Sequence, residues 1–268
     1  MTTDTVVHHP RFGPAMPALD WIPAPRYVLR RDRVLHLLKN FKPGKVLDIG
    51  CGPGALICEL GALGYEAFGV DRSAKAREIG HHLERSSSRM KLRSELDERW
   101  KGEFDLIMSF EVIEHLRDDV GALREWRDFL KPGGRMILST PAHPSRWNAA
   151  DEWAGHVRRY TRQQLVQSVE EAGFEVEHVE CYGFPLANVM EVLSAPGYRR
   201  RLEEKKSRFG SAGALTEDSG SDRSAHSRFW PLYSGILSTA AMRFFCALQR
   251  PFLNSDLGNG YIVVAKAA

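Results

Sequence analysis

The chain has few cysteines and no long apolar run. Its 268 residues include four cysteines, which are scattered rather than set in pairs: Cys51, Cys58, Cys181 and Cys246. This spacing argues against a disulfide framework and against a zinc site, and it favours a reduced, cytoplasmic compartment. No stretch approaches the roughly 18 to 20 apolar residues that a membrane-spanning helix needs, and the first residues lack the pattern of a signal peptide.

A strong excess of one charge is also missing. Lysine and arginine number 37 against 34 aspartates and glutamates, so the formal net charge is +3. Because no recognised RNA-binding motif appears either, nucleic acid is not expected as a partner. The hydrophobic share of 43% is that of an ordinary globular protein, and the length suits one domain with an insertion.

Short apolar runs do alternate with stretches of helical periodicity. Strands are expected at 46–49, 67–70, 90–93, 104–110, 135–140, 174–182 and 260–267. Helices are expected between them at 27–41, 55–63, 74–84, 119–130 and 162–172, with a turn at 131–134. Such alternation predicts a parallel α/β sheet with helices on both faces.

The same pattern divides the chain into four segments. Residues 1–41 form an N-terminal arm and helix that covers the site, with a loose arm expected over 1–25. Residues 42–184 form the core and 259–268 its closing strand. Residues 185–258 are expected to be an insertion or lid, flexible at 207–228 because serine and glycine are frequent there.

Three glycines at alternate positions follow the first predicted strand, in VLDIGCGPGAL. Gly50, Gly52 and Gly54 permit positive φ angles and close approach of a ligand to the backbone. Sheets of this type bind ligands at the C-terminal ends of their strands, where a helix N-terminus offers free N–H groups. The letters also satisfy the G-x-G-x-x-G/A pattern, so an NAD-dependent oxidoreductase is an alternative.

Two carboxylates bear on the choice of ligand. Asp48 precedes the loop and would repel a pyrophosphate by on the order of 3 kcal/mol at about 5 Å and an effective dielectric constant near 20. A ligand with an ammonium and a sulfonium would instead be attracted. Asp71 ends the next predicted strand and suits the hydroxyl groups of a ribose, which both kinds of ligand contain.

Four stretches occur in the order and at the spacing of known motifs: VLDIGCGPG, VDRS, FDLIMSFEVIEHL and LKPGGRMILSTP. Over residues 45–180 the chain resembles the class I S-adenosylmethionine-dependent methyltransferases, and GYIVVAKA resembles their closing strand. The resemblance implies a Rossmann-like, seven-stranded, mostly parallel sheet with an antiparallel last strand. It also implies S-adenosylmethionine as the cofactor and S-adenosylhomocysteine as its product.

The resemblance carries roles over by position. The methionine part of the cofactor would face Asp48, Gly50, Cys51, Gly52 and Gly54. The ribose would lie on Asp71 and the adenine near Arg72, with a further adenine contact from Ser94, Glu95 or Leu96. Phe110 and Glu111 would border the sulfonium. No metal ligand is expected.

Three histidines lie where the methyl acceptor is expected. A hydroxyl acceptor must lose a proton, and histidine is the usual base, so His156 ranks first, His143 second and His115 third. Each also has a structural interpretation as a packed or hydrogen-bonded loop residue. The predicted function is in-line O-methylation of a small-molecule or lipid-linked acceptor, and a non-catalytic binding protein of the same fold is a further alternative.

The insertion carries an apolar, aromatic segment. Between 229 and 253 the charged residues are Arg243 and Arg250, and a basic run precedes it at 199–208. One interpretation is a segment that contacts the membrane surface and makes the protein peripheral to it. The favoured one is a helix that covers the sheet or forms a homodimer contact.

Overall fold

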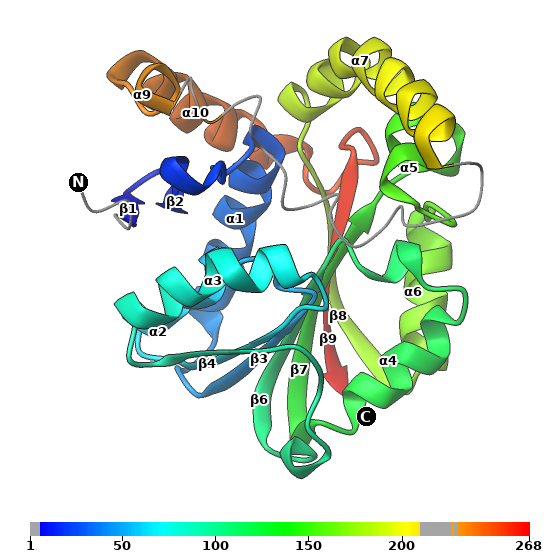
Figure 1. The fold of residues 1–268 in the computed structure, drawn as a ribbon. Helices are drawn as coiled ribbons and strands as arrows, with labels where there is room; N and C mark the ends of the chain where they lie inside the picture. The colour runs from blue at the N-terminus through cyan, green and yellow to red at the C-terminus, as the bar shows by residue number, and fades with distance from the viewer. Residues whose placement is uncertain (1–5, 210–226, 228–229) are drawn as a thin grey trace.

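The computed structural model describes residues 6–209, 227 and 230–268, and its centre is a sheet of seven strands (Figure 1). The strand order is β5-β4-β3-β6-β7-β9-β8. The bounds are β3 (Lys45–Ile49), β4 (Glu66–Val70), β5 (Met90–Arg93), β6 (Phe104–Phe110), β7 (Leu130–Pro141), β8 (Phe174–Tyr182) and β9 (Gly260–Ala267). β9 runs antiparallel to β7 and β8, while the other neighbours pair in parallel. The predicted fold class is confirmed.

Helices cover both faces of this sheet (Figure 1). The helices are α1 (Pro25–Leu37), α2 (Ala55–Ala62), α3 (Ala74–Ser86), α4 (Asp119–Arg127), α5 (Ala149–Ala154) and α6 (Arg162–Glu171). Val46 of β3 packs in the apolar cluster that includes α1, α2 and α3, whereas Leu47 packs in the cluster that includes α4 and α6. Successive strand residues point to opposite faces, so two covered faces explain why the central strands are almost wholly apolar.

The N-terminal arm is ordered and packed. The strands β1 (Val7–His9) and β2 (Gly13–Ala15) pair as an antiparallel hairpin, and Phe12 between them is fully buried. The Phe12 ring lies 4.6 Å from that of Tyr233, centroid to centroid. The expectation of a loose arm is therefore wrong for residues 6–24, because this stretch forms a hairpin whose Phe12 packs against Tyr233, more than 200 residues away.

The insertion is helical in its described parts: α7 (Leu186–Phe209), α9 (Trp230–Tyr233) and α10 (Ile236–Leu248). Met242 and Cys246 of α10 are buried in the cluster that includes α1. Of the region predicted to be flexible, 207–209 complete α7, while 210–226 and 228 lie outside the described residues. The predicted turn at 131–134 lies within β7, where the pairing with β6 shifts register.

The four-segment division of the chain remains a prediction.

No helix in the described parts of the chain is both long and apolar enough to cross a membrane.

Candidate functional site

The glycine loop connects β3 to α2 and turns through three positive φ angles. The φ angles of Gly50, Gly52 and Gly54 are 73°, 56° and 80°. A Cβ at Gly50 would lie 2.3 Å from Val112 Cγ2, whereas one at Gly52 would meet nothing within 4 Å. Gly50 is thus required for packing as well as conformation, and Gly52 leaves its backbone open to a ligand.

Asp71 joins the loop to the end of β4. The Gly52 N–H donates to Asp71 Oδ2 at 2.7 Å, and the Ser73 N–H donates to Oδ1 at 2.9 Å. Ser73 is the N-cap of α3, since its hydroxyl accepts from the Ala76 N–H at 3.1 Å. Asp71 is therefore not needed as the helix cap and is held against the glycine loop instead.

Asp48 lies under the loop and is 3% exposed. Its Oδ1 has no hydrogen-bond partner among the described residues. Burial raises the pKa of this carboxyl to about 8, although the nearby Arg30 opposes the shift. A buried, unsatisfied carboxyl of this kind is costly, and a cationic or N–H-bearing ligand would remove the cost.

The other residues predicted for the cofactor surround the loop. Cys51 is half-buried, its thiol donates to the Gly52 carbonyl oxygen at 3.4 Å, and burial raises its pKa well above the usual range. Arg72, Ser94 and Glu95 are exposed and directly follow β4 and β5. All of them belong to the C-terminal edge of the parallel strands, as predicted.

Glu111 follows the last residue of β6, Phe110, and has a φ of 61°. Two arginines of α1 reach it: Arg26 Nη2 lies 2.7 Å from Oε2 and Arg30 Nη1 3.3 Å from Oε1. Burial opposes ionisation, but the two guanidinium groups outweigh it and lower the pKa of Glu111 to about 2. Arg30 also stacks over the Phe110 ring, 5.0 Å from its centroid, so α1 is fastened to this end of the sheet.

Of the three predicted histidines, the structure brings two together. His115 ends the short helix η4 (Ile113–His115), His156 follows α5, and their ring centroids lie 4.7 Å apart. His143 lies apart from them. Its Nε2 donates to the Gly258 carbonyl oxygen at 3.1 Å, and burial lowers its pKa.

His156 is oriented by a carboxylate. Its Nδ1 lies 2.9 Å from Asp151 Oδ1, and Arg159 holds the same carboxylate through bonds of 2.7 and 2.8 Å. Burial would raise the pKa of Asp151, but His156 and Arg159 outweigh it and lower the pKa to about 2. The Nε2 of His156 points the other way, toward Glu114 Oε1 at 3.9 Å.

Glu114 is a site residue that the sequence reasoning missed, as it missed Arg26 and Asp151. It is fully buried, and Thr140 Oγ1 donates to its Oε2 at 3.2 Å. Burial and the neighbouring Glu111 raise its pKa well above the usual range, and burial together with His156 lowers the pKa of His115 to about 4. The spacing of EVIEHL, with a second carboxylate three residues after Glu111 and next to His115, was the available signal.

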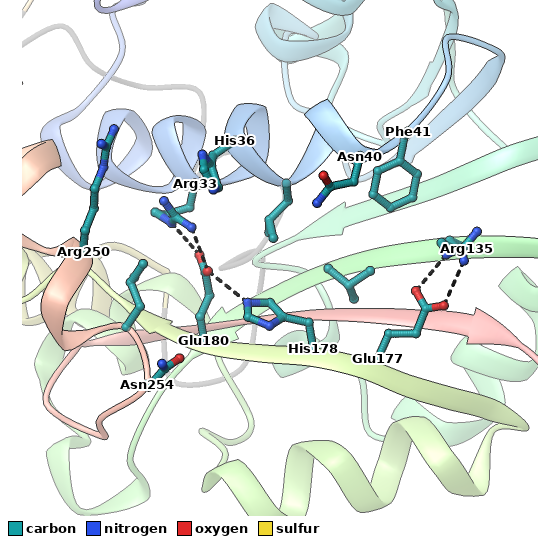
Figure 2. A pocket seen from close by; sticks show the side chains of 13 residues that line it. Arg33, His36, Asn40, Phe41, Arg135, Glu177, His178, Glu180, Arg250 and Asn254 are labelled. Atoms are coloured by element: carbon teal, nitrogen blue, oxygen red, sulfur yellow. Dashed lines mark hydrogen bonds and ion pairs between the residues drawn. The ribbon is translucent and has the colours of Figure 1, made fainter.

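A cavity of about 540 Å³ lies between α1 and the strands β8 and β9 (Figure 2). Its lining includes Arg33 and Arg135, whose guanidinium groups donate to Glu180 and Glu177 respectively. These two arginines are therefore neutralised by carboxylates. None of the predicted site residues lines the cavity, so it is separate from the glycine loop.

Residues 24–179 match a family described as "Methyltransferase domain", which covers more than half of the chain. The chain belongs to the class I S-adenosylmethionine-dependent methyltransferase family. The resemblance seen in the sequence is confirmed, and so is S-adenosylmethionine as the cofactor. The unsatisfied Asp48 Oδ1 and the open backbone at Gly52 fit a ligand that carries an ammonium group and no phosphate.

Curated relatives of this methyltransferase include two proteins named ubiquinone biosynthesis O-methyltransferase. The one from Cereibacter sphaeroides is 37% identical over 113 residues, which are 41% of this chain and 46% of the relative. The one from Roseobacter denitrificans is 33% identical over 134 residues, 48% of this chain and 54% of the relative. The chain thus spans about half the length of the curated relatives it matches.

Solved structures of methyltransferases share the fold. An S-adenosylmethionine-dependent methyltransferase from Mesorhizobium loti superposes with a TM-score of 0.54 at 16% identity, over 92% of this chain and 99% of that one. Phosphoethanolamine N-methyltransferase 2 from Haemonchus contortus, solved with S-adenosyl-L-methionine, gives 0.52 at 18% identity, over 88% and 52%. At this identity the likeness concerns the fold alone.

Proposed function

We propose that this methyltransferase methylates a hydroxyl oxygen of a small-molecule or lipid-linked acceptor. The observation that carries the proposal is the Asp151–His156 pair, whose imidazole Nε2 is left facing the interior beside Glu114. A carboxylate on Nδ1 fixes the orientation of the ring and leaves Nε2 to accept a proton, which a hydroxyl acceptor must lose. The names of the curated relatives, which specify O-methylation, support oxygen as the acceptor atom.

The donor-binding roles follow from the position of each group. Asp48 would accept from the ammonium group of the methionine part, and the open backbone of Gly50–Gly54 would lie against its chain. Asp71 would accept from the ribose hydroxyls. Phe110 and Glu111 would border the sulfonium, and Arg72 with Ser94 or Glu95 would flank the adenine.

When bound, S-adenosylmethionine supplies a methyl group activated by a positively charged sulfur. The remaining task of the protein is to align the acceptor oxygen with that carbon and to take its proton. His156 Nε2 would remove the hydroxyl proton while the new O–CH₃ bond forms and the S–CH₃ bond breaks. The product S-adenosylhomocysteine is then a neutral thioether, and the proton leaves from His156 to water.

Calorimetry and an acceptor screen test this function. S-adenosylhomocysteine should bind with one site per chain, and NAD should not bind. Methyl transfer should then be detected by mass spectrometry with hydroxyl acceptors, tested with and without a long alkyl tail, and be absent with matched amines. Binding of NAD in place of S-adenosylhomocysteine would support the oxidoreductase alternative, whereas binding without transfer to any acceptor would support the non-catalytic one.

A lipid-linked acceptor would require contact with a membrane surface. Four apolar side chains of α9 and α10 are largely exposed: Leu232, Ile236, Leu237 and Phe244. The helices α9 and α10 lie, with α7, at the end of the molecule toward which the parallel strands run (Figure 1). We propose that they touch the membrane interface, helped by Arg199–Arg201 on α7. Flotation with anionic liposomes at low salt should recover the protein, whereas dimerisation without flotation would assign this surface to a homodimer.

A further inference from the structure

Glu114, His115 and His156 form a compact cluster of metal-binding side-chain types. A carboxylate oxygen of Glu114 and one ring nitrogen from each histidine all lie within 4.8 Å of one another. Glu114 and His115 belong to η4, while His156 follows α5, more than 40 residues later. Two separate parts of the chain therefore bring three candidate ligand atoms within 4.8 Å of one another.

Each imidazole ring is held in place through its Nδ1 atom. His156 Nδ1 is bonded to Asp151 at 2.9 Å, and His115 Nδ1 lies 3.4 Å from the Gly155 carbonyl oxygen, to which it donates. A proton on each Nδ1 leaves the Nε2 lone pair available. Histidines that bind metals are held in this way, by a carboxylate or a backbone carbonyl on the other ring nitrogen.

Glu114 provides an independent observation that points to a ligand. Its side chain is fully buried, and Oε1 has no hydrogen-bond partner among the described residues. The nearest ion-pair contact of this oxygen is His156 Nε2, at 3.9 Å, which is too long for a hydrogen bond. A buried carboxylate oxygen without a partner is costly, and a bound cation between Glu114 and the two rings would satisfy it.

We propose that Glu114, His115 and His156 bind one divalent first-row transition-metal ion. One carboxylate oxygen and two imidazole nitrogens suit zinc, manganese, iron or cobalt better than calcium or magnesium, which prefer oxygen ligands. Three protein ligands leave coordination positions open, which is the arrangement of catalytic rather than structural metal sites.

The cluster lies close to Glu111 at the end of β6, because the charge of Glu111 acts on both Glu114 and His115. We therefore expect the open positions to be near the acceptor. A hydroxyl oxygen bound there would lose its proton to water at a lower pH, since the ion stabilises the alkoxide or phenolate. In the metal-free protein His156 Nε2 accepts the proton, as proposed above, whereas in the metal-bound protein it holds the ion and the proton passes to water. This catalytic use rests on the proposed function, whereas binding of the ion does not.

Cobalt titration tests the site without relying on activity. Protein stripped with a chelator is titrated with Co²⁺ and followed by its visible absorption, with metal content measured by mass spectrometry. We expect one Co²⁺ per chain, competed away by Zn²⁺. Glu114→Gln and His115→Ala should each weaken binding at least tenfold. His81→Ala is the matched control, because His81 is an exposed histidine of α3 paired with Glu84, and it should bind as the wild type does.

Thermal unfolding of each variant identifies those that fold, and the comparison uses these. The proposal is overturned if the wild type shows no saturable Co²⁺ binding, if a folded cluster variant binds as tightly as the wild type, or if His81→Ala weakens binding equally. Calorimetry with S-adenosylhomocysteine on the same metal-free protein separates the two claims. Failure to bind that nucleoside would contradict the proposed function and leave the metal result unaffected.

Discussion

The glycine loop and the histidine cluster occupy the same edge of the sheet, but they are built in different ways. The loop and its two acids come from one stretch, residues 48–71, in which Gly52 and Asp71 are joined by a direct hydrogen bond. The cluster draws His115 from η4 and His156 from the segment after α5, and Asp151 and Arg159 fix its geometry. The donor side is therefore a local construction and the acceptor side a long-range one.

Two carboxylates show the electrostatic side of this difference. Asp48 is buried and Glu111 is half-buried, both near strand ends. Burial raises the pKa of Asp48 to about 8, whereas Arg26 and Arg30 outweigh burial and lower the pKa of Glu111 to about 2. The direction of the pKa shift depends on whether a neighbouring helix or strand places a cation beside the carboxyl group. Glu111 is paired with two arginines, whereas Asp48 Oδ1 has no hydrogen-bond partner among the described residues.

The largest expected effect is on the acceptor side. His156→Ala should lower turnover at least 100-fold and change the affinity for S-adenosylhomocysteine less than threefold, because the ring lies beyond the loop. His143→Ala, whose ring is held at Gly258, should cost less than tenfold in turnover. Steady-state kinetics and calorimetry on both variants measure this. A larger loss in His143→Ala would reverse the ranking of the two histidines.

On the donor side, Asp71→Ala should weaken nucleoside binding by about 1.5 to 3 kcal/mol, through the lost charged hydrogen bonds to ribose. The loop also loses the acceptor for the Gly52 N–H, so the effect should appear mainly in affinity, with turnover at saturating donor reduced less. Calorimetry with S-adenosylhomocysteine measures this change in binding affinity. Unchanged affinity would show that the ribose does not bind to Asp71.

A matched pair of glycines separates backbone strain from ligand contact. Gly52→Ala and Gly102→Ala both place a side chain at positive φ, 56° and 73°, with nothing within 4 Å of the new Cβ. Each should lower the free energy of unfolding by about 1 kcal/mol. Gly52→Ala should also weaken nucleoside binding at least tenfold, while Gly102→Ala should not. Equal affinities in the two variants would mean that no ligand lies over Gly52.

The smallest effect concerns the stability of the ligand-free protein. The pKa of Asp48 is raised from its ordinary 3.8 to about 8, so the folded state retains a proton that the unfolded chain releases. This contribution to stability is complete below about pH 4 and is lost as the pH rises to about 8. Asp48→Asn should therefore be more stable than the wild type at pH 8, because the amide does not ionise.

Urea unfolding of both proteins at pH 5 and pH 8 checks this, and the difference between them should be larger at pH 8. A wild type whose stability rises from pH 5 to pH 8 relative to Asp48→Asn would show that Asp48 is ionised and satisfied without a ligand. The same variant should bind S-adenosylhomocysteine more weakly, because it lacks the charge that the ammonium needs.

How far the sequence predicts each element depends on the distance over which its interactions act. The strands and helices of the core follow from apolar periodicity, and the predicted strand at 90–93 matches β5. The hairpin of the arm does not, because Phe12 is an apolar residue in a proline-containing stretch and packs against Trp230 and Tyr233 of the insertion. The apolar pattern of neighbouring residues cannot predict a packing partner that lies more than 200 residues away in the chain.

The candidate site divides in the same way. Asp48 and the three glycines follow from one motif and Asp71 from the next, and the structure places them together. The sequence ranks His156 before His143 and His115, but it cannot show which of the three rings meet. The fold separates His143 from the other two, and it adds the buried Glu114, which reads in the sequence as one acid among many.

The sequence by itself determined the alternation of strands and helices, the glycine turn with its two acids, and hence the family and its cofactor. These depend on periodicity and on backbone conformation, which neighbouring residues set. Only the tertiary structure decided which histidines meet, which carboxylates gain an arginine and which remain unsatisfied. Burial and charge pairing depend on distances in space, and the chain sets those distances only once it has folded.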